Sequence, residues 1–385
     1  MWFITGSTVW ALNRLGEGAG WLGLRPGLDP AALRVLAVRR AGLADDGAEI
    51  EGLTVACESL PEADLSTFGT AAVREILVTM LVQRLRLLEL RRSDRSRLRT
   101  PVHRPIVIVG LPRSGTTLLH RLLAAVPGHR ALRTWELADV LGTGEPSRRR
   151  AEAAARLGLL TRLAPELAYK HTFEVDGPEE EVSLFDASLC TPTLWRFARV
   201  QRYLEWTLAT DPLPAYRVFR EILGVLQAQT PDARLVLKLP EHHGTLDALR
   251  TVLPDAVFVQ PERDPVPVVG SYCSLAASVH GVFSERVDRR ALGDASLRLW
   301  SWHAAQNAAQ QGPDVLRMRY ADLRDDPVGA VERVLGHAGS ALDADGRGVV
   351  QEAADARPHG GRHSYDLADF GLTEAQVRGA LAGTG

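Results

Sequence analysis

The sequence predicts an α/β fold of three layers, with a central parallel sheet flanked by helices and an additional N-terminal helical region. A β-branched run, a turn containing Gly and Pro, and an apolar helix pattern follow one another over residues 106–126. Apolar runs at 235–239, 256–260 and 315–320 also lead into helical patterns. Residues 1–100 show helical spacing without the alternation of strands. Strands and helices that alternate in this way predict parallel strands joined by right-handed crossovers.

The loop after the first predicted strand, from Gly110 to Thr117, has the character of a phosphate-binding loop. Its two glycines have the spacing of a Walker A loop, and a helix begins directly after it, which presents backbone N–H groups to an anion. Thr116 stands where a Walker A loop has the lysine that contacts ATP phosphates, and a cation lies inside the loop instead, at Arg113. The loop therefore predicts a P-loop-like fold that binds phosphate groups other than those of Mg-ATP. The alternative is an ordinary strand–turn–helix connection.

The composition is that of a globular protein without strong charge bias. The chain has 385 residues, 45% of them hydrophobic, and a net charge of −2, which argues against a nucleic-acid-binding surface. Its three scattered cysteines suit a reducing compartment. We find no charged segment before an N-terminal apolar run and no window approaching 18 uninterrupted apolar residues. We therefore expect no signal peptide, no membrane span and a cytoplasmic location.

Two helical regions are expected outside the sheet. Residues 1–100 form an N-terminal helical extension, in which one long helix from 60 to 98 is capped by Asp64. Residues 101–385 form the main domain, with a helical insertion at about 146–230.

Aromatic residues crowd the N-terminus of the extension, at Trp2, Phe3, Trp10 and Trp21. Such residues indicate a packed helix or a contact between subunits. From the second possibility we expect a homo-oligomer formed through the N-terminal region. The alternative is a hydrophobic lid or a membrane-surface contact for an apolar substrate.

Residues of chemical interest stand at the carboxyl ends of four predicted strands, namely Gly110, Lys238, Arg263 and Tyr320. A further short strand is expected to end at 133–136. Ligands of parallel sheets bind at the carboxyl ends of the strands. These positions therefore predict one shared site.

Two loops carry further candidate groups. A turn at 176–181 ends in three glutamates, among them Glu180, which either complement a helix dipole or serve the site. The segment 357–372 is rich in Gly, His and Arg and includes Gly361 and Arg362. It is either a flexible tail or a flap that faces a phosphate.

These motifs together resemble the PAPS-dependent sulfotransferase family, in particular its bacterial branch, where PAPS is 3′-phosphoadenosine-5′-phosphosulfate. Residues 112–117 look like the loop that binds the 5′-phosphosulfate. Arg263 and Ser271 look like the pair that binds the 3′-phosphate, and the segment 320–327 looks like the one whose tyrosine lies near the adenine. The resemblance covers roughly residues 100–372.

The resemblance implies a metal-independent sulfotransferase whose catalytic domain is residues 101–385. It implies in-line transfer of a sulfo group from PAPS to a hydroxyl of a small-molecule, lipid or glycan acceptor, with release of PAP. The implied donor-binding residues are Arg113, Ser114, Gly115, Thr116, Thr117, Arg263, Ser271, Tyr320, Gly361 and Arg362.

The chain also departs from the cytosolic members of that family. They carry lysine where Arg113 stands, whereas bacterial members commonly have arginine. Their Gly-rich segment that closes on the 3′-phosphate is not matched literally, and Gly361 and Arg362 are assigned to this role in its place. The first hundred residues match nothing in the cytosolic enzymes, although bacterial members have helical extensions.

The catalytic roles follow from the charge that develops during transfer. Lys238, with Arg113 beside it, is the candidate cation for the oxygen that leaves sulfur. The acceptor needs a general base. The resemblance makes His242 the first candidate, because the family has a histidine after this strand, and Glu180 the second, because some bacterial members use a glutamate. The remaining candidates are His171 and His243.

Two other functions remain open at this point. One is a P-loop kinase or NTPase, against which Thr116 and the pair Arg263 and Ser271 argue. The other is a repurposed, non-sulfating member of the same fold. The acceptor is not identified, and the aromatic residues that either line an apolar cleft or belong to the core are Phe173, Phe185, Trp195, Phe197, Tyr203 and Trp206.

Overall fold

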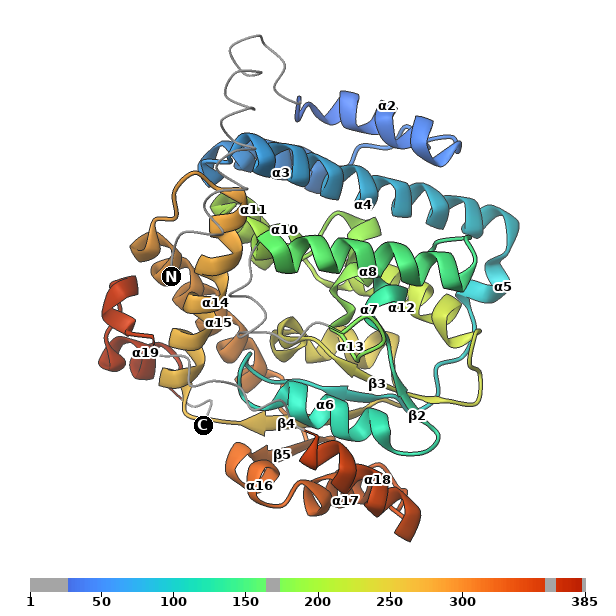
Figure 1. Cartoon of the computed structure of the whole chain (residues 1–385), viewed down its shortest axis with the longest axis vertical. Helices are drawn as coiled ribbons and strands as arrows, with labels where there is room; N and C mark the ends of the chain where they lie inside the picture. Colours follow the sequence, from blue (N-terminus) through green and yellow to red (C-terminus); the bar gives the residue numbers. More distant parts are fainter. Residues whose placement is uncertain (1–26, 164–173, 357–364, 383–385) are drawn as a thin grey trace.

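The computed structural model describes residues 27–163, 174–356 and 365–382 of the chain. Within these residues the centre is a sheet of five parallel strands in the order β2-β3-β1-β4-β5 (Figure 1). The strands are β1 Ile106–Ile108, β2 His129–Ala131, β3 Arg234–Lys238, β4 Val257–Glu262 and β5 Val315–Arg319. The predicted α/β fold with a central parallel sheet is confirmed.

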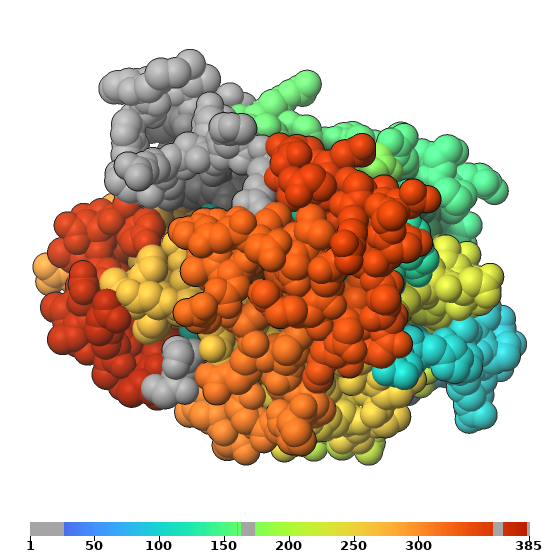
Figure 2. Space-filling model, turned by 90° about the horizontal axis from the view of Figure 1, so that it is seen from below, coloured from blue at the N-terminus to red at the C-terminus, as the bar shows by residue number. Residues whose placement is uncertain are grey.

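Both faces of the sheet are apolar because successive side chains of a strand point to opposite sides. Val107 lies in one buried cluster, whereas its neighbours Ile106 and Ile108 lie in another. Helices α12 and α13 pack on the first face, and α6, α17 and α18 pack on the second. Their bounds are α6 Thr116–Ala125, α12 Leu213–Gln227, α13 Leu246–Val252, α17 Pro327–His337 and α18 Ala344–Asp355. Seen from below, α17 and α18 form much of the molecular surface (Figure 2).

The N-terminal extension lies above the rest of the molecule in Figure 1 and has its own apolar cluster. That cluster also takes in side chains of the insertion, such as Leu194 and Tyr203, which fixes the extension to the main domain. Its elements are α2 Pro30–Ala41, α3 Glu51–Ser59, the 3-10 helix η1 Leu60–Ala63, α4 Thr67–Ser93 and α5 Arg95–Leu98.

The prediction of one helix from 60 to 98 with Asp64 as its cap is wrong. Asp64 has a φ of 46°, a left-handed conformation that separates η1 from α4. The cap is Ser66, whose Oγ accepts a hydrogen bond from the N–H of Gly69 at 2.9 Å. A second break follows Ser93, after which α5 forms a separate turn of helix.

The helical insertion contributes short elements above the sheet. These are α7 Thr134–Leu137, α8 Pro146–Leu163, the 3-10 helix η2 Glu181–Ser188, α10 Thr193–Phe197 and α11 Gln201–Ala209. The strand expected to end at 133–136 is instead helix α7, and the strand β2 precedes it. The Glu136 carboxylate accepts from the backbone N–H of Arg133 and from Nη2 of Arg130 at 2.9 and 2.5 Å, which favours a helix start at this point.

The remaining elements complete the flank of the sheet next to β4 and β5. They are η3 Pro240–Gly244, α14 Pro265–Phe283, α15 Arg289–Ala309, α16 Tyr320–Asp325, η4 Leu367–Phe370 and α19 Glu374–Ala380. Helix α14 is long and apolar enough to cross a membrane by those two criteria, but 61% of it is buried inside the protein. A core helix meets the same criteria, so α14 carries no argument for a membrane span.

Candidate functional site

The carboxyl ends of the strands bring the predicted residues together. Ile108 of β1 pairs with Lys238 of β3 on one side and with Val259 of β4 on the other. The loop after β1, the last residue of β3, and Arg263 after β4 therefore meet at one edge of the sheet. Tyr320 reaches the same edge as the first residue after β5.

The loop that follows β1 is shaped for close approach of a ligand and of Tyr320. Gly115 has a φ of 99°, and a Cβ at this position would lie 2.6 Å from Cδ2 of Tyr320. Arg113 also has a positive φ, of 66°. The Oγ of Ser114 donates to the carbonyl of Leu111 at 2.7 Å, which closes the turn before α6 begins at Thr116. The local conformation thus explains why glycine and small residues occupy this loop.

Arg113, Arg263, Ser271 and Tyr320 form one cluster at the mouth of the loop. Nε of Arg113 donates to Oγ of Ser271 at 3.1 Å, and Nη1 of Arg263 donates to the carbonyl of Arg113 at 2.9 Å. The guanidinium of Arg263 lies 4.6 Å from the centre of the Tyr320 ring. Desolvation and the positive charge of Arg263 lower the pKa of Arg113. Two guanidinium groups held so close together favour binding of an anion.

Lys238 lies between the loop and the acidic turn. Its side chain is buried, and its Nζ donates to Oε1 of Glu180 at 2.6 Å and to Oγ1 of Thr117 at 3.5 Å. The backbone N–H of Lys238 donates to Oε2 of Glu181 at 3.0 Å. One cation is therefore within reach of both a loop hydroxyl and a carboxylate.

Glu180 also forms an ion pair with Arg196, which extends the network away from the sheet. Nη1 of Arg196 lies 2.5 Å from Oε2 of Glu180, and Nη2 lies 2.9 Å from Oε2 of Glu241. Sequence reasoning did not single out Arg196 or Glu241, because α10 and the loop after β3 carry no motif that marks them.

His242 lies in a hydrogen-bond network inside the protein. Its side chain is wholly buried, its Nδ1 bonds to the Tyr216 hydroxyl at 2.6 Å, and its Nε2 bonds to Oε1 of Glu181 at 3.0 Å. Both ring nitrogens are thus engaged inside the protein. His243 is buried as well, and burial lowers its pKa to about 3. The roles of both histidines as the general base stay predictions.

Three predicted site residues lie outside the described residues, namely His171, Gly361 and Arg362. Their roles stay predictions. Among the described residues no group of three or more His, Cys, Asp or Glu side chains could hold a metal ion. The expected independence of metals also stays a prediction.

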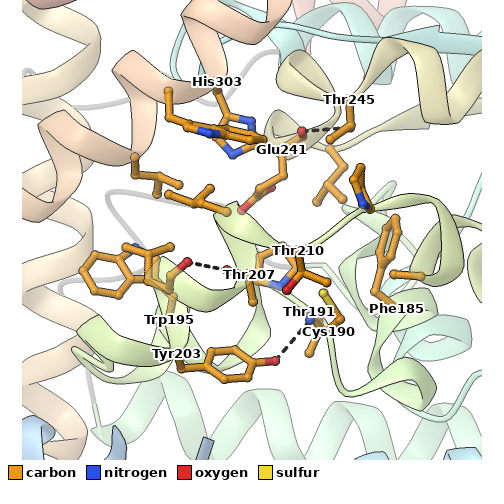
Figure 3. A pocket seen from close by; sticks show the side chains of 18 of the residues that line it. Phe185, Cys190, Thr191, Trp195, Tyr203, Thr207, Thr210, Glu241, Thr245 and His303 are labelled. Carbon is orange, nitrogen blue, oxygen red and sulfur yellow. Dashed lines mark hydrogen bonds between the residues drawn. The ribbon is translucent and has the colours of Figure 1, made fainter. Parts of the chain in front are cut away.

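A largely apolar pocket adjoins the Arg196–Glu241 pair, with an empty volume of about 760 Å³ that includes space open to solvent. The side chain of Glu241 points into it beside aromatic and threonine side chains (Figure 3). Of the predicted aromatic residues, Phe185, Trp195 and Tyr203 line the pocket. The ring of Phe197 packs 5.3 Å from that of Phe283 instead. Trp206 packs on the ring of Tyr203, and Phe173 lies outside the described residues.

Comparisons with known proteins bear on the family and the fold. The sulfotransferase family model matches residues 105–344. The solved structure of sulfotransferase STF1 from Mycobacterium tuberculosis H37Rv is 28% identical, with a TM-score of 0.76, over 92% of this chain and 98% of that chain. Sulfotransferase STF9 from Mycobacterium avium is 23% identical, with a TM-score of 0.81, over 91% and 94%. No curated protein sequence matches the chain.

Proposed function

The chain belongs to the sulfotransferase family, and from this premise we propose that it transfers a sulfo group from PAPS to a hydroxyl group, releasing PAP. The acceptor is a small molecule, a lipid or a glycan. We also propose that the protein acts in the cytoplasm without a metal ion, and that its N-terminal region forms a homo-oligomer.

The observation that carries the proposal is the cluster of Arg113, Arg263, Ser271 and Tyr320 at the mouth of the loop. PAPS has two separate anionic ends and an aromatic base. The loop and the start of α6 suit the 5′-phosphosulfate, because a helix N-terminus and small residues favour a bound oxyanion. Arg263 and Ser271 suit the 3′-phosphate, since a guanidinium binds an oxyanion through parallel hydrogen bonds. The close contact of Tyr320 with Gly115 leaves an aromatic ring beside the same space for the base.

Sulfo transfer at this site needs a base for the acceptor and positive charge for the leaving oxygen. The acceptor oxygen attacks sulfur while the bond from sulfur to the 5′-phosphate oxygen breaks, and that oxygen keeps the electron pair. Lys238 and Arg113 stabilise the negative charge that develops there. Glu180 receives the acceptor proton, because its carboxylate is the group that contacts Lys238 at the strand edge.

The pocket beside Glu241 suits the part of the acceptor that does not react. Arg196 contacts both Glu180 and Glu241, so its guanidinium links the wall of the pocket to the proposed base. We therefore place the apolar body of the acceptor in this pocket (Figure 3).

Titration calorimetry with PAP and with Mg-ATP tests the donor. We expect PAP to bind and Mg-ATP to bind weakly or not at all, because Thr116 occupies the position of the Walker lysine. Tight binding of Mg-ATP without binding of PAP would instead support a kinase or NTPase. A panel of phenols, sterols, sugars and polyketides, read by the mass gain of one sulfo group, tests transfer and separates an active enzyme from a repurposed one.

A further inference from the structure

Four side chains of alternating charge run from the sheet edge to the pocket. Lys238 at the end of β3 contacts Glu180 before η2 at 2.6 Å. Glu180 contacts Arg196 of α10 at 2.5 Å, and Arg196 contacts Glu241 of η3 at 2.9 Å. Lys238 and Glu241 are three positions apart in the sequence, whereas Glu180 and Arg196 come from other segments that the fold brings beside them.

The guanidinium of Arg196 is shared between two carboxylates. One Nη atom faces Glu180, and the other donates to both oxygens of Glu241 at 3.1 and 2.9 Å. A planar guanidinium held at both ends fixes the carboxylate of Glu180 in orientation as well as in position. Desolvation alone would lower the pKa of Arg196, but Glu241 and Glu180 outweigh it and raise that pKa. Arg196 therefore remains a cation at every pH of interest.

The charges of Arg196 and Glu241 have opposite effects on the carboxylate of Glu180. The positive charge of Arg196 lies against the Glu180 carboxylate and stabilises its negative charge. Glu241 offsets this effect, because its negative charge neutralises part of the guanidinium. Other charged groups near Glu180 are Lys238, Arg113, Glu179 and Glu181, the last of which is engaged with His242 and the backbone of Lys238.

We infer that Arg196 is a positioning residue for the reaction, which holds Glu180 at the acceptor hydroxyl while Glu241 restrains the effect of its charge. This inference rests on the proposed function, in which Glu180 is the general base. Glu241 lines the pocket (Figure 3), so in this inference the pair lies between the acceptor body and the reacting centre.

The pH dependence of kcat tests this role with three variants. In Arg196→Gln the acid limb of the profile moves up by about one pH unit, since Glu180 loses a cation. In Glu241→Gln the same limb moves down, since Arg196 then acts on Glu180 alone. Arg196→Lys keeps the charge without the planar contact, so its limb stays near that of the wild type while kcat falls.

Two controls isolate the effect from general damage. Arg91→Gln removes a comparable pair, formed by Arg91 of α4 and Glu221 of α12 at 2.6 Å, and leaves the limb in place. Asp186 is half-buried, and desolvation raises its pKa to about 7 within reach of the Arg196 charge. The shift in Arg196→Gln therefore has to persist in an Asp186→Asn background.

The outcomes separate the inference from the function on which it rests. Shifts of the acid limb in the same direction for Arg196→Gln and Glu241→Gln, or a fall in kcat of Arg196→Gln without any shift of its limb, would overturn the positioning role. If Arg196→Gln does not fold, unchanged kcat in Arg196→Lys overturns it as well. Failure of the unmodified protein to bind PAP defeats the proposed function instead, and wild-type turnover in Glu180→Gln defeats the assignment of the base.

Discussion

The donor side of the site and its acceptor side are built in different ways. On the donor side, the loop after β1, Arg263 and Tyr320 stand at the ends of parallel strands, and the register of the sheet aligns them. On the acceptor side, Glu180 precedes η2, Arg196 and Glu241 lie in the short helices α10 and η3, and ion pairs hold the three together. The sheet thus sets the geometry of the proposed donor site, whereas ion pairs between short segments set that of the proposed base and acceptor pocket.

The first prediction separates catalysis from donor binding. Glu180→Gln lowers kcat by about 10³-fold, since a general base contributes 10² to 10⁴-fold. Affinity for PAP, measured by calorimetry, stays close to that of the wild type, because the carboxylate belongs to the acceptor side. A large loss of PAP affinity would show that the two sides are not independent.

The second prediction acts on the donor side alone. Arg263→Ala weakens PAP binding by roughly 10- to 100-fold, in line with about 1.5–3 kcal/mol for a hydrogen bond to a charged group. The control is Arg319→Ala, one residue before Tyr320, whose guanidinium pairs with Asp322 at 2.8 Å on the exposed surface. Equal losses in both variants would point to a general charge effect and not to a phosphate contact.

The third prediction fills the pocket. Thr207→Phe raises the KM of an apolar acceptor by about 10-fold and leaves PAP affinity unchanged. The larger side chain takes space from the acceptor, and a 10-fold rise corresponds to the loss of roughly one or two buried methylene groups. Thr207 bonds to the backbone carbonyl of Leu204, and Thr251 on α13 makes a similar bond to that of Asp247. Thr251→Phe is therefore the matched control. An unchanged KM in Thr207→Phe would move the acceptor out of the pocket.

The fourth prediction, with the smallest expected effect, concerns how the free energy of unfolding depends on pH. Burial lowers the pKa of His243 to about 3, below its ordinary value of 6.5. The unfolded chain therefore binds a proton that the folded chain does not, and stability falls as the pH drops from about 6.5 toward 3. Between pH 7 and 5.5, His243→Phe loses about 1 kcal/mol less stability than the wild type in denaturant titrations. Identical losses would indicate that His243 is protonated in the folded state.

The same contrast explains which parts of the molecule could be predicted from the sequence. The donor loop is contiguous, and strand ends meet at one edge in any parallel sheet, so Arg113, Lys238 and Tyr320 could be grouped before the structure was known. Arg196 could not, because an arginine in a short helix has no pattern that reveals its partners. His242 was the first candidate base because it follows a strand. Its neighbour in the sequence, Glu241, is the residue that faces the pocket.

Errors in the secondary structure have a similar local origin. The segment at 133–136 looked like a strand end, but the contacts of Glu136 with Arg130 and Arg133 begin a helix. Asp64 looked like a helix cap, but it adopts a left-handed conformation and Ser66 takes that role. In both cases the deciding contact is one hydrogen bond between side chain and backbone, which hydrophobic spacing does not encode.

The contact between Gly115 and Tyr320 has a consequence for biosynthesis. The loop is translated about two hundred residues before the tyrosine that packs on it. A nascent chain that has released β1, β3 and β4 from the ribosome already carries the loop, Lys238 and Arg263, but lacks the ring that packs against the loop. Chains arrested on the ribosome before and after β5 emerges should therefore differ in their retention on a PAP affinity matrix, which would then report when the donor site is completed during translation.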